Sequence, residues 1–174
     1  NTGDILALAV APSYNPNKTR NLAMLKNPAV SNSYEPGSVF KIVTAAAALE
    51  HIPGIKREII FCENGEYKLY KDVKIRDHDK QSWLSIERVI AYSSNIGCAK
   101  LARRVGPQKF WQVARAFGFG VPTGIDLPGE TGGKFLSPEK WSGISCEMIS
   151  FGQELSATPI QIINSFSVVA NGGF

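Results

Sequence analysis

The chain has 174 residues, which is enough for one domain with a sizeable hydrophobic core. Apolar residues make up 44% of it and charged residues 20%, as in ordinary globular proteins, so a disordered or low-complexity chain is excluded. The net charge is only +4, and the densest basic stretch, KLYKDVKIR, is interrupted by apolar residues, which argues against a nucleic-acid partner. No stretch reaches the roughly 18 consecutive apolar residues of a membrane span.

The first residues predict a turn followed by a buried strand. We expect the turn at residues 2–4 and the strand from about Ile5 to Ala11. Both faces of this strand are apolar, which favours a central position in a sheet. No signal peptide opens the chain, and it begins abruptly in this element, so we expect the natural N-terminus to lie further upstream.

Helical patterns dominate the rest of the chain. After a polar loop, the first helix is expected from about Gly37 to Glu50. Residues 55–80 look irregular, with short strands. Further helices are expected over residues 86–92 with Ser85 as cap, over residues 95–105, over residues 107–117, briefly after Ser137-Pro138, and from Thr158 as N-cap to Gly172.

The glycines and the cysteines of the chain lack the spacing that a nucleotide-binding site or a metal-binding site requires. The glycines of GFGVPTGIDLPGETGG, residues 118–133, match neither a dinucleotide-binding fingerprint nor a phosphate-binding loop, so turns explain them. Cys62, Cys98 and Cys146 form no C-x-x-C pair, which excludes a zinc ribbon or a thioredoxin motif within the chain. We expect these cysteines to be small buried apolar residues.

One charged residue interrupts the helix expected over residues 37–50. Lys41 has apolar neighbours on nearly every side, and a helix that is apolar all round is buried. Lysine is almost never fully buried without a partner. Lys41 therefore either lies near the helix end and reaches water with its amine, or faces a cleft and takes part in chemistry.

Ser38 favours the second explanation. Residues three apart share one face of a helix, so the Ser38 hydroxyl and the Lys41 amine can meet. Ser38 also lies in the first turn, where free backbone N–H groups and the helix dipole favour a developing negative charge. A serine nucleophile needs a neighbouring base, and lysine can serve when its surroundings lower its pKa. The S-x-x-K pattern fixes only two residues, so it does not decide the function alone.

A second polar motif, YSSNIG, lies between two expected helices. Ser93 and Asn95 flank one residue there, which by itself is ordinary cap and turn chemistry. The order of S-x-x-K and then S-x-N, however, resembles the first two motifs of the active-site serine penicillin-recognising enzymes.

The segments around these motifs extend the resemblance over nearly the whole chain. TGDILALAVAPSYNPN, YEPGSVFKIVTAAAALE, YSSNIGCAKLARRVG, FGFGVPTGIDLPGE and ISFGQELSATPIQIINSFSVVANGG resemble, in this order, the transpeptidase domain of class B penicillin-binding proteins. EPGS, and SFGQ followed by TPIQ, resemble the division-specific, septal subgroup more than the elongation subgroup. The third family motif, K-T-G or K-S-G, is absent, and TGGK at residues 131–134 has the wrong order. We therefore expect residues 1–174 to be the N-terminal and central part of an incomplete transpeptidase domain.

The resemblance implies a peptidoglycan D,D-transpeptidase that cross-links stem peptides through a serine acyl-enzyme. Ser38 would attack the carbonyl before the terminal D-alanine, and Lys41 would take the hydroxyl proton. Ser93 would relay a proton toward the leaving nitrogen, while Asn95 would bind the substrate backbone and hold Lys41. β-Lactam antibiotics would acylate the same serine. No metal and no organic cofactor would be needed.

The resemblance also implies a fold, partners and a location. The family fold is an α/β, serine β-lactamase-like arrangement in which helices flank an antiparallel sheet, and this chain is expected to be a helix-rich part of it. Stem peptides, β-lactams and other cell-division membrane proteins are the expected partners. The catalytic domain would lie on the periplasmic or extracytoplasmic side of the bacterial cytoplasmic membrane, with an anchor outside these residues.

Other functions remain as alternatives. A class A β-lactamase needs a glutamate in an E-x-x-L-N loop after the second motif, and none follows Asn95; Ser94 also replaces the usual aspartate. A class D-like enzyme or sensor would prefer S-x-V. An elongation-type transpeptidase, and a non-catalytic binding module without the third motif, also stay open.

His51 and His78 are the other candidates for a base. His51 lies at the end of an expected helix, where an imidazolium is stabilised. The stretch RDHDK places Asp77, His78 and Asp79 side by side, but adjacent side chains do not converge as a Ser-His-Asp triad or a metal site requires. A solvated loop explains this stretch better.

Overall fold

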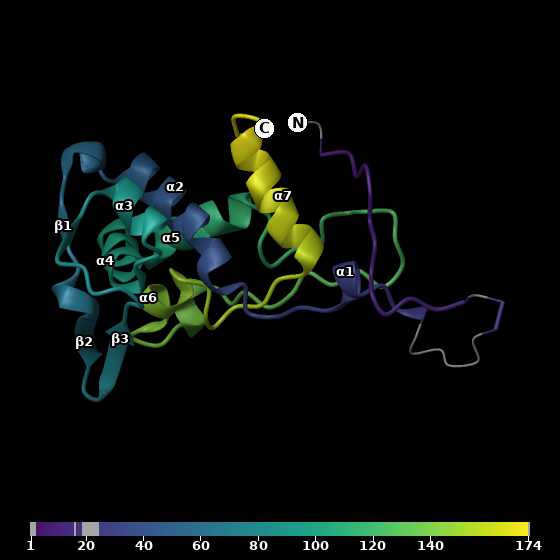
Figure 1. Cartoon of the computed structure of the whole chain (residues 1–174), viewed down its shortest axis with the longest axis horizontal. Coiled ribbons are helices and arrows are strands. Elements are labelled where there is room, and N and C mark those ends of the chain that lie inside the picture. Colours follow the sequence, from purple (N-terminus) through teal and green to yellow (C-terminus); the bar gives the residue numbers. More distant parts are fainter. Residues whose placement is uncertain (1–2, 16, 19–24, 174) are drawn as a thin grey trace.

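Helices form the main body of the molecule (Figure 1). The computed structural model describes residues 3–15, 17–18 and 25–173. Its elements, in chain order, are α1 (Pro28–Ser31), the 3-10 turn η2 (Gly37–Phe40), α2 (Lys41–His51), η3 (Ile55–Arg57), β1 (Ile60–Phe61), η4 (Glu63–Gly65), β2 (Glu66–Tyr70), β3 (Val73–Arg76), β4 (Trp83–Leu84), α3 (Ile86–Ala91), α4 (Asn95–Val105), α5 (Pro107–Ala116), η5 (Pro138–Lys140), α6 (Ser145–Ile149) and α7 (Pro159–Ala170).

Helix α2 lies at the centre of the hydrophobic core. It packs against α4 and α5, and α4 in turn packs against α6 (Figure 1). Val43, Ala47 and Ala48 on α2 are fully buried. The run of alanines leaves α2 with little side-chain bulk, so neighbouring helices can approach it closely. The buried helix predicted from Gly37 to Glu50 is thus confirmed, with a 3-10 first turn.

The helix ends follow the capping residues that the sequence predicts. The hydroxyl of Ser85 accepts the Arg88 N–H at the start of α3. In α7 the Thr158 hydroxyl accepts the Gln161 N–H at 3.3 Å, and the Gln161 carbonyl oxygen Oε1 accepts the Thr158 N–H at 2.9 Å. These reciprocal bonds satisfy two backbone donors that a helix start leaves free.

The strands form two small antiparallel sheets. β1 pairs with β4, placing Ile60 opposite Leu84, and β2 pairs with β3, placing Tyr67 opposite Ile75. Figure 1 shows the β2–β3 hairpin extending from the side of the body beneath α4. The expected α/β class, rich in helices and with antiparallel strands, is confirmed.

The strand predicted from Ile5 to Ala11 is wrong. This segment runs without strand pairing, and Leu6 is 96% exposed. A strand is stable only when its backbone groups pair with a neighbour, and no described segment pairs with this one. Apolar composition alone therefore does not make the segment a strand. The turn predicted at residues 2–4 lies partly outside the described residues.

Within the described ranges, no helix has both the length and the apolar character that crossing a membrane requires.

Candidate functional site

Ser38 lies in the tight turn η2, which runs directly into α2. Ser38 is exposed, whereas Phe40 is buried and packs edge-on against Phe119, with ring centroids 4.8 Å apart. Gly37 begins the turn at φ = 60°, a left-handed conformation that glycine adopts without steric cost. The buried ring therefore anchors the turn to the core while Ser38 stays open to solvent.

A turn from the later part of the chain supports η2 from outside. The Gly37 N–H donates to the Gly152 carbonyl over 3.1 Å, and the Thr44 hydroxyl donates to the Ser150 carbonyl over 2.7 Å. Gly152 has φ = 85°, and a Cβ there would collide with the Gly37 carbonyl oxygen. Only glycine fits this position, because any side chain would overlap the turn that carries Ser38.

Lys41 is buried, with only 2% of its surface exposed. Its Nζ donates to the Ser93 hydroxyl over 2.8 Å and also to the Ser93 carbonyl. Burial lowers the pKa of Lys41 below its usual value, and the neighbouring Cys98 and Asp77 oppose this shift. A buried amine with a lowered pKa is suited to accept a proton.

Ser93 owes its two contacts with Lys41 to an unusual backbone conformation. It has φ = 53°, in the left-handed region, at the turn between α3 and α4. The Ser93 N–H donates to the Ile90 carbonyl over 3.0 Å, and the Ser94 N–H donates to the Val89 carbonyl over 2.9 Å. This conformation lets the carbonyl and the hydroxyl of one residue bind the same amine. Non-glycine residues held in this region cluster at functional sites.

Asn95 begins α4 and is held by the end of strand β3. Its side-chain amide donates to the Arg76 carbonyl over 2.8 Å. In the described part of the chain no hydrogen bond joins Asn95 to Lys41. The expected grip of Asn95 on Lys41 is therefore not formed here, and Ser93 takes that place.

Asp77, the residue after β3, is the site residue that the sequence did not reveal. Its carboxylate accepts the Ser94 hydroxyl and the Asn95 N–H, each over 2.6 Å, and the Ile96 N–H over 3.0 Å. Sequence patterns assign Asp77 to a solvated loop, because no spacing connects it to the second motif. Only the fold brings the two together.

The structure thus brings Lys41, Ser93 and Asn95 to one place, with Ser38 one turn before Lys41. No hydrogen bond joins Ser38 to Lys41 within the described residues, because the amine is directed toward Ser93. An exposed hydroxyl, a buried amine and a second hydroxyl follow one another around the start of α2. Such a series of groups can take a proton from a nucleophile and pass it on.

Comparison with known proteins shows the family to which the chain belongs. The family model of the penicillin binding protein transpeptidase domain matches residues 1–174. The chain belongs to this transpeptidase family. It is 36% identical to the penicillin-binding protein PbpB of Mycolicibacterium smegmatis over 99% of its length, and 31% identical to the peptidoglycan D,D-transpeptidase FtsI of Escherichia coli over 99%. The chain spans 27% and 29% of the lengths of these two relatives.

A solved structure of a penicillin-binding protein has the same fold. The crystal structure of penicillin binding protein 3 from Mycobacterium tuberculosis, in complex with aztreonam, matches with a TM-score of 0.78 and 36% identity. The match covers 86% of this chain and 33% of that one.

The two histidines do not join the serine–lysine site. The His78 ring is 98% exposed and lies 3.2 Å from Asp79, while His51 is paired with Glu50 at 3.9 Å. Among the described residues no cluster of three or more histidine, cysteine or acidic side chains could hold a metal ion. All three cysteines are free, and Cys62 and Cys98 are buried as expected.

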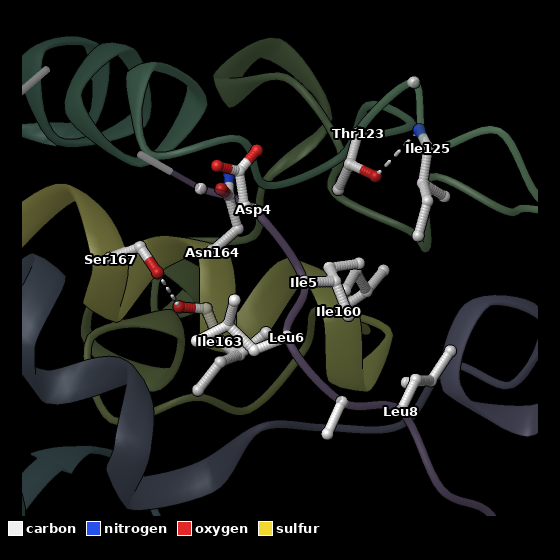
Figure 2. A pocket seen from close by; sticks show the side chains of 13 residues that line it. Asp4, Ile5, Leu6, Leu8, Thr123, Ile125, Ile160, Ile163, Asn164 and Ser167 are labelled. Atoms are coloured by element: carbon white, nitrogen blue, oxygen red, sulfur yellow. Dashed lines mark hydrogen bonds between the residues drawn. The ribbon is translucent and has the colours of Figure 1, made fainter. Parts of the chain in front are cut away.

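A separate hollow of about 520 Å³ lies between the N-terminal segment and α7. Figure 2 shows Ile5 and Leu6 of that segment beside Ile160 and Ile163 of α7. None of the four predicted site residues lines this hollow. It is a space between an extended segment and a helix, and the four predicted site residues lie outside its lining.

Proposed function

We propose that the chain is part of a serine-type peptidoglycan D,D-transpeptidase, with Ser38 as nucleophile and Lys41 as its base. The observation that carries the proposal is the Lys41 amine, which is buried and lies 2.8 Å from the Ser93 hydroxyl, one turn after the exposed Ser38. A buried amine is more easily kept neutral, and only a neutral amine can accept the Ser38 proton.

In the proposed reaction, the Ser38 hydroxyl oxygen attacks the carbonyl carbon before the terminal D-alanine of a stem peptide. Lys41 takes the hydroxyl proton. As the carbon–nitrogen bond breaks, Ser93 passes its hydroxyl proton to the leaving nitrogen and receives one from protonated Lys41, and D-alanine departs. The amine of a second stem peptide then attacks the ester, its surplus proton returns to Ser38, and a cross-link has formed. This route needs no metal or organic cofactor.

Charge on the carbonyl oxygen must be stabilised during both steps. The Ser38 N–H lies in the first turn of a helical segment, where backbone donors are free and the dipole favours an anion. We propose that a second donor and Asn95 complete the substrate site, and that the third motif lies beyond these 174 residues in the full-length protein. Residues 1–174 would then be the first part of a transpeptidase domain.

We further propose a septal role. The relatives PbpB and FtsI, and the resemblance of the segments around Ser38 and Gly152, support division-specific transpeptidation over the elongation type. β-Lactams are proposed as inhibitors, supported by the aztreonam complex of the Mycobacterium tuberculosis protein. Other division proteins would be the partners, and the domain would act outside the cytoplasmic membrane.

Labelling with a fluorescent penicillin tests the proposal in the full-length protein. The wild type should become covalently labelled, and mass spectrometry should place the adduct on Ser38. Ser38→Ala should abolish labelling. Ser167→Ala, on the remote helix α7, is the matched control and should label normally. Labelling that survives Ser38→Ala would remove Ser38 from its proposed role.

A further inference from the structure

Asp77 connects a small sheet to the turn that holds the lysine amine. It follows β3 directly, and it is partly buried. One carboxylate oxygen, Oδ1, accepts the backbone N–H groups of Asn95 and Ile96; the other, Oδ2, accepts the Ser94 hydroxyl. Three hydrogen bonds from consecutive residues therefore converge on a single side chain. Charge-assisted bonds of this kind are about twice as strong as neutral ones.

The same side chain binds the residues that follow a strained position. Ser93 immediately precedes the three donors and keeps φ = 53°. A non-glycine residue in such a conformation is strained and persists only where its surroundings hold it. The bonds to Asp77 fix Ser94, Asn95 and Ile96, so they also fix the direction in which the chain leaves Ser93. That direction decides whether Ser93 presents both of its oxygens to Lys41.

A further connection links this end of β3 to the same turn. The Asn95 amide donates to the Arg76 carbonyl, so both the backbone of Arg76 and the side chain of Asp77 bind the start of α4. The Ser94 hydroxyl also accepts the Gly97 N–H over 2.9 Å while donating to Asp77. The turn is thus held from the β3 side, independently of the segment that carries Ser38.

We propose that Asp77 is a positioning residue for acylation: by holding the Ser93–Asn95 turn, it keeps the Ser93 oxygens on the Lys41 amine. The inference rests on the proposed function, because it assigns Asp77 a role in the same site. Asp77 acts through Ser93 and Lys41 rather than on the substrate or the nucleophile.

Charge adds a second effect that a purely structural cap would lack. The groups that bear on Lys41 electrostatically are Asp77, after β3, and Cys98, on α4. Burial raises the pKa of Cys98 to about 12, so its thiol is neutral near pH 7, and burial likewise raises the pKa of the nearby Cys62 thiol. Asp77 is then the anion that favours protonated Lys41. Removing its charge should lower the pKa of Lys41 further.

Two substitutions separate these effects. Asp77→Asn keeps an oxygen for the two N–H groups and a polar atom for Ser94 but removes the charge. Asp77→Ala removes the bonds as well. Asp79→Asn, two residues later in the same loop, is the matched control, because its carboxylate binds the exposed His78 instead of the turn. For each full-length variant the rate of acylation by fluorescent penicillin is measured as a function of pH, and thermal unfolding confirms that the protein is folded.

Asp77→Asn should keep a high plateau rate of acylation. The part of its pH–rate profile in which the rate falls with acid, the acidic limb, should move to lower pH, because the pKa of Lys41 is lower. Asp77→Ala should lose about tenfold or more of the plateau rate, since small misplacements of catalytic groups cost up to about 10²-fold. Asp79→Asn should match the wild type. If Asp77→Ala does not fold, the pH–rate profile of Asp77→Asn still shows, by the pH of its acidic limb, whether the charge of Asp77 acts on Lys41.

A wild-type plateau in folded Asp77→Ala would overturn the positioning role, and a profile of Asp77→Asn that superimposes on the wild type would overturn the effect of the Asp77 charge on Lys41. Either result would leave the proposed function intact. Absence of labelling in the wild type itself would overturn the proposed function and this inference together.

Discussion

At the scale of single residues, the direction of the Lys41 amine determines which proton transfers the candidate site can carry out. Lys41 gives its hydrogen bonds to Ser93, so the two residues form one unit beside the exposed Ser38. This arrangement suits proton transfer in both directions, from the nucleophile and toward a leaving group. It also explains how a buried lysine is tolerated in a largely apolar helix, because its charge-bearing end has polar partners.

The acylation rate should fall as the pH is lowered through the pKa of Lys41. Protonated Lys41 cannot accept the Ser38 proton, so the base form, present above this pKa, is the active one. Because burial lowers the pKa of Lys41, the acidic limb should lie below the pH at which a free lysine would titrate. Rates of fluorescent-penicillin labelling across a pH series measure the limb. A limb at the pH of free lysine would contradict the effect of burial.

Lys41→Arg should lose about 10²–10⁴-fold in acylation rate at every pH, because arginine stays protonated and general-base catalysis contributes about this much. Lys109→Arg, exposed on α5, is the control and should be unaffected. Labelling rates of both full-length variants measure the loss. An Arg variant that retains the wild-type pH profile would contradict the role of Lys41 as base.

Short motifs revealed some of these residues and not others. Sequence spacing predicts that Ser38 and Lys41 lie one turn apart, and Ser93 was found from the order of the motifs. Asp77 could not be found this way, because its link to Ser94 and Asn95 depends on where β3 ends in space. The direction of the Lys41 amine also escaped prediction, since spacing brings Ser38 and Lys41 together but does not show which hydroxyl the amine binds.

At the scale of elements, a close contact between two turns holds Ser38, the proposed nucleophile. Gly152 approaches the turn η2 so closely that there is no room for a side chain between them. The hydroxyl of Thr44 adds a second bond from α2 to the same late turn. The turn η2 is thus supported both by the anchored Phe40 ring and by the buried Gly152.

Gly152→Ala should destabilise the protein and slow acylation. The new Cβ would collide with the Gly37 carbonyl oxygen, and a non-glycine residue at φ = 85° adds strain of about 1–3 kcal/mol. Gly143→Ala is the control, because a Cβ there would have no atom within 4 Å and its φ is not left-handed. Urea unfolding and penicillin labelling measure both effects. Equal stability of the two variants would show that the turns do not need this contact.

Helices and strands were predicted correctly from the sequence where neighbouring residues determine the element. The prediction failed where the element depends on a partner far away in the chain. The caps Ser85 and Thr158 start helices because their hydroxyls accept nearby N–H groups. The segment from Ile5 to Ala11 has the composition of a strand, yet strand formation requires a neighbour with free backbone groups. Composition does not show whether such a neighbour is available.

At the scale of the whole molecule, the described residues supply a candidate nucleophile, base and proton relay, whereas the sequence lacks the third motif of the family. Apolar side chains on α7 and the N-terminal segment are also exposed, among them Ile163 at 59% and Leu6 at 96%. Both features fit a full-length protein that continues with the third motif, as proposed.

The 174-residue chain alone should therefore be acylated much more slowly than the full-length protein. Loss of one oxyanion donor costs about 10²–10³-fold in rate, and poor ligand positioning adds to this. Side-by-side labelling with fluorescent penicillin, with Ser38→Ala as the blank, measures the ratio. Circular dichroism of the short chain verifies that it is folded. Equal rates would show that acylation does not depend on further residues.

The bond between Thr44 and Ser150 joins residues 106 positions apart, and this has a consequence for biosynthesis. Closing so long a loop costs chain entropy, and contacts between distant residues slow folding. While the protein is being synthesised, a chain that has emerged as far as Lys41 but not yet as far as Gly152 lacks the contact that supports the turn of Ser38. Under the proposed function, we therefore expect Ser38 to react with a β-lactam only after residues up to Gly152 have emerged and folded onto its turn.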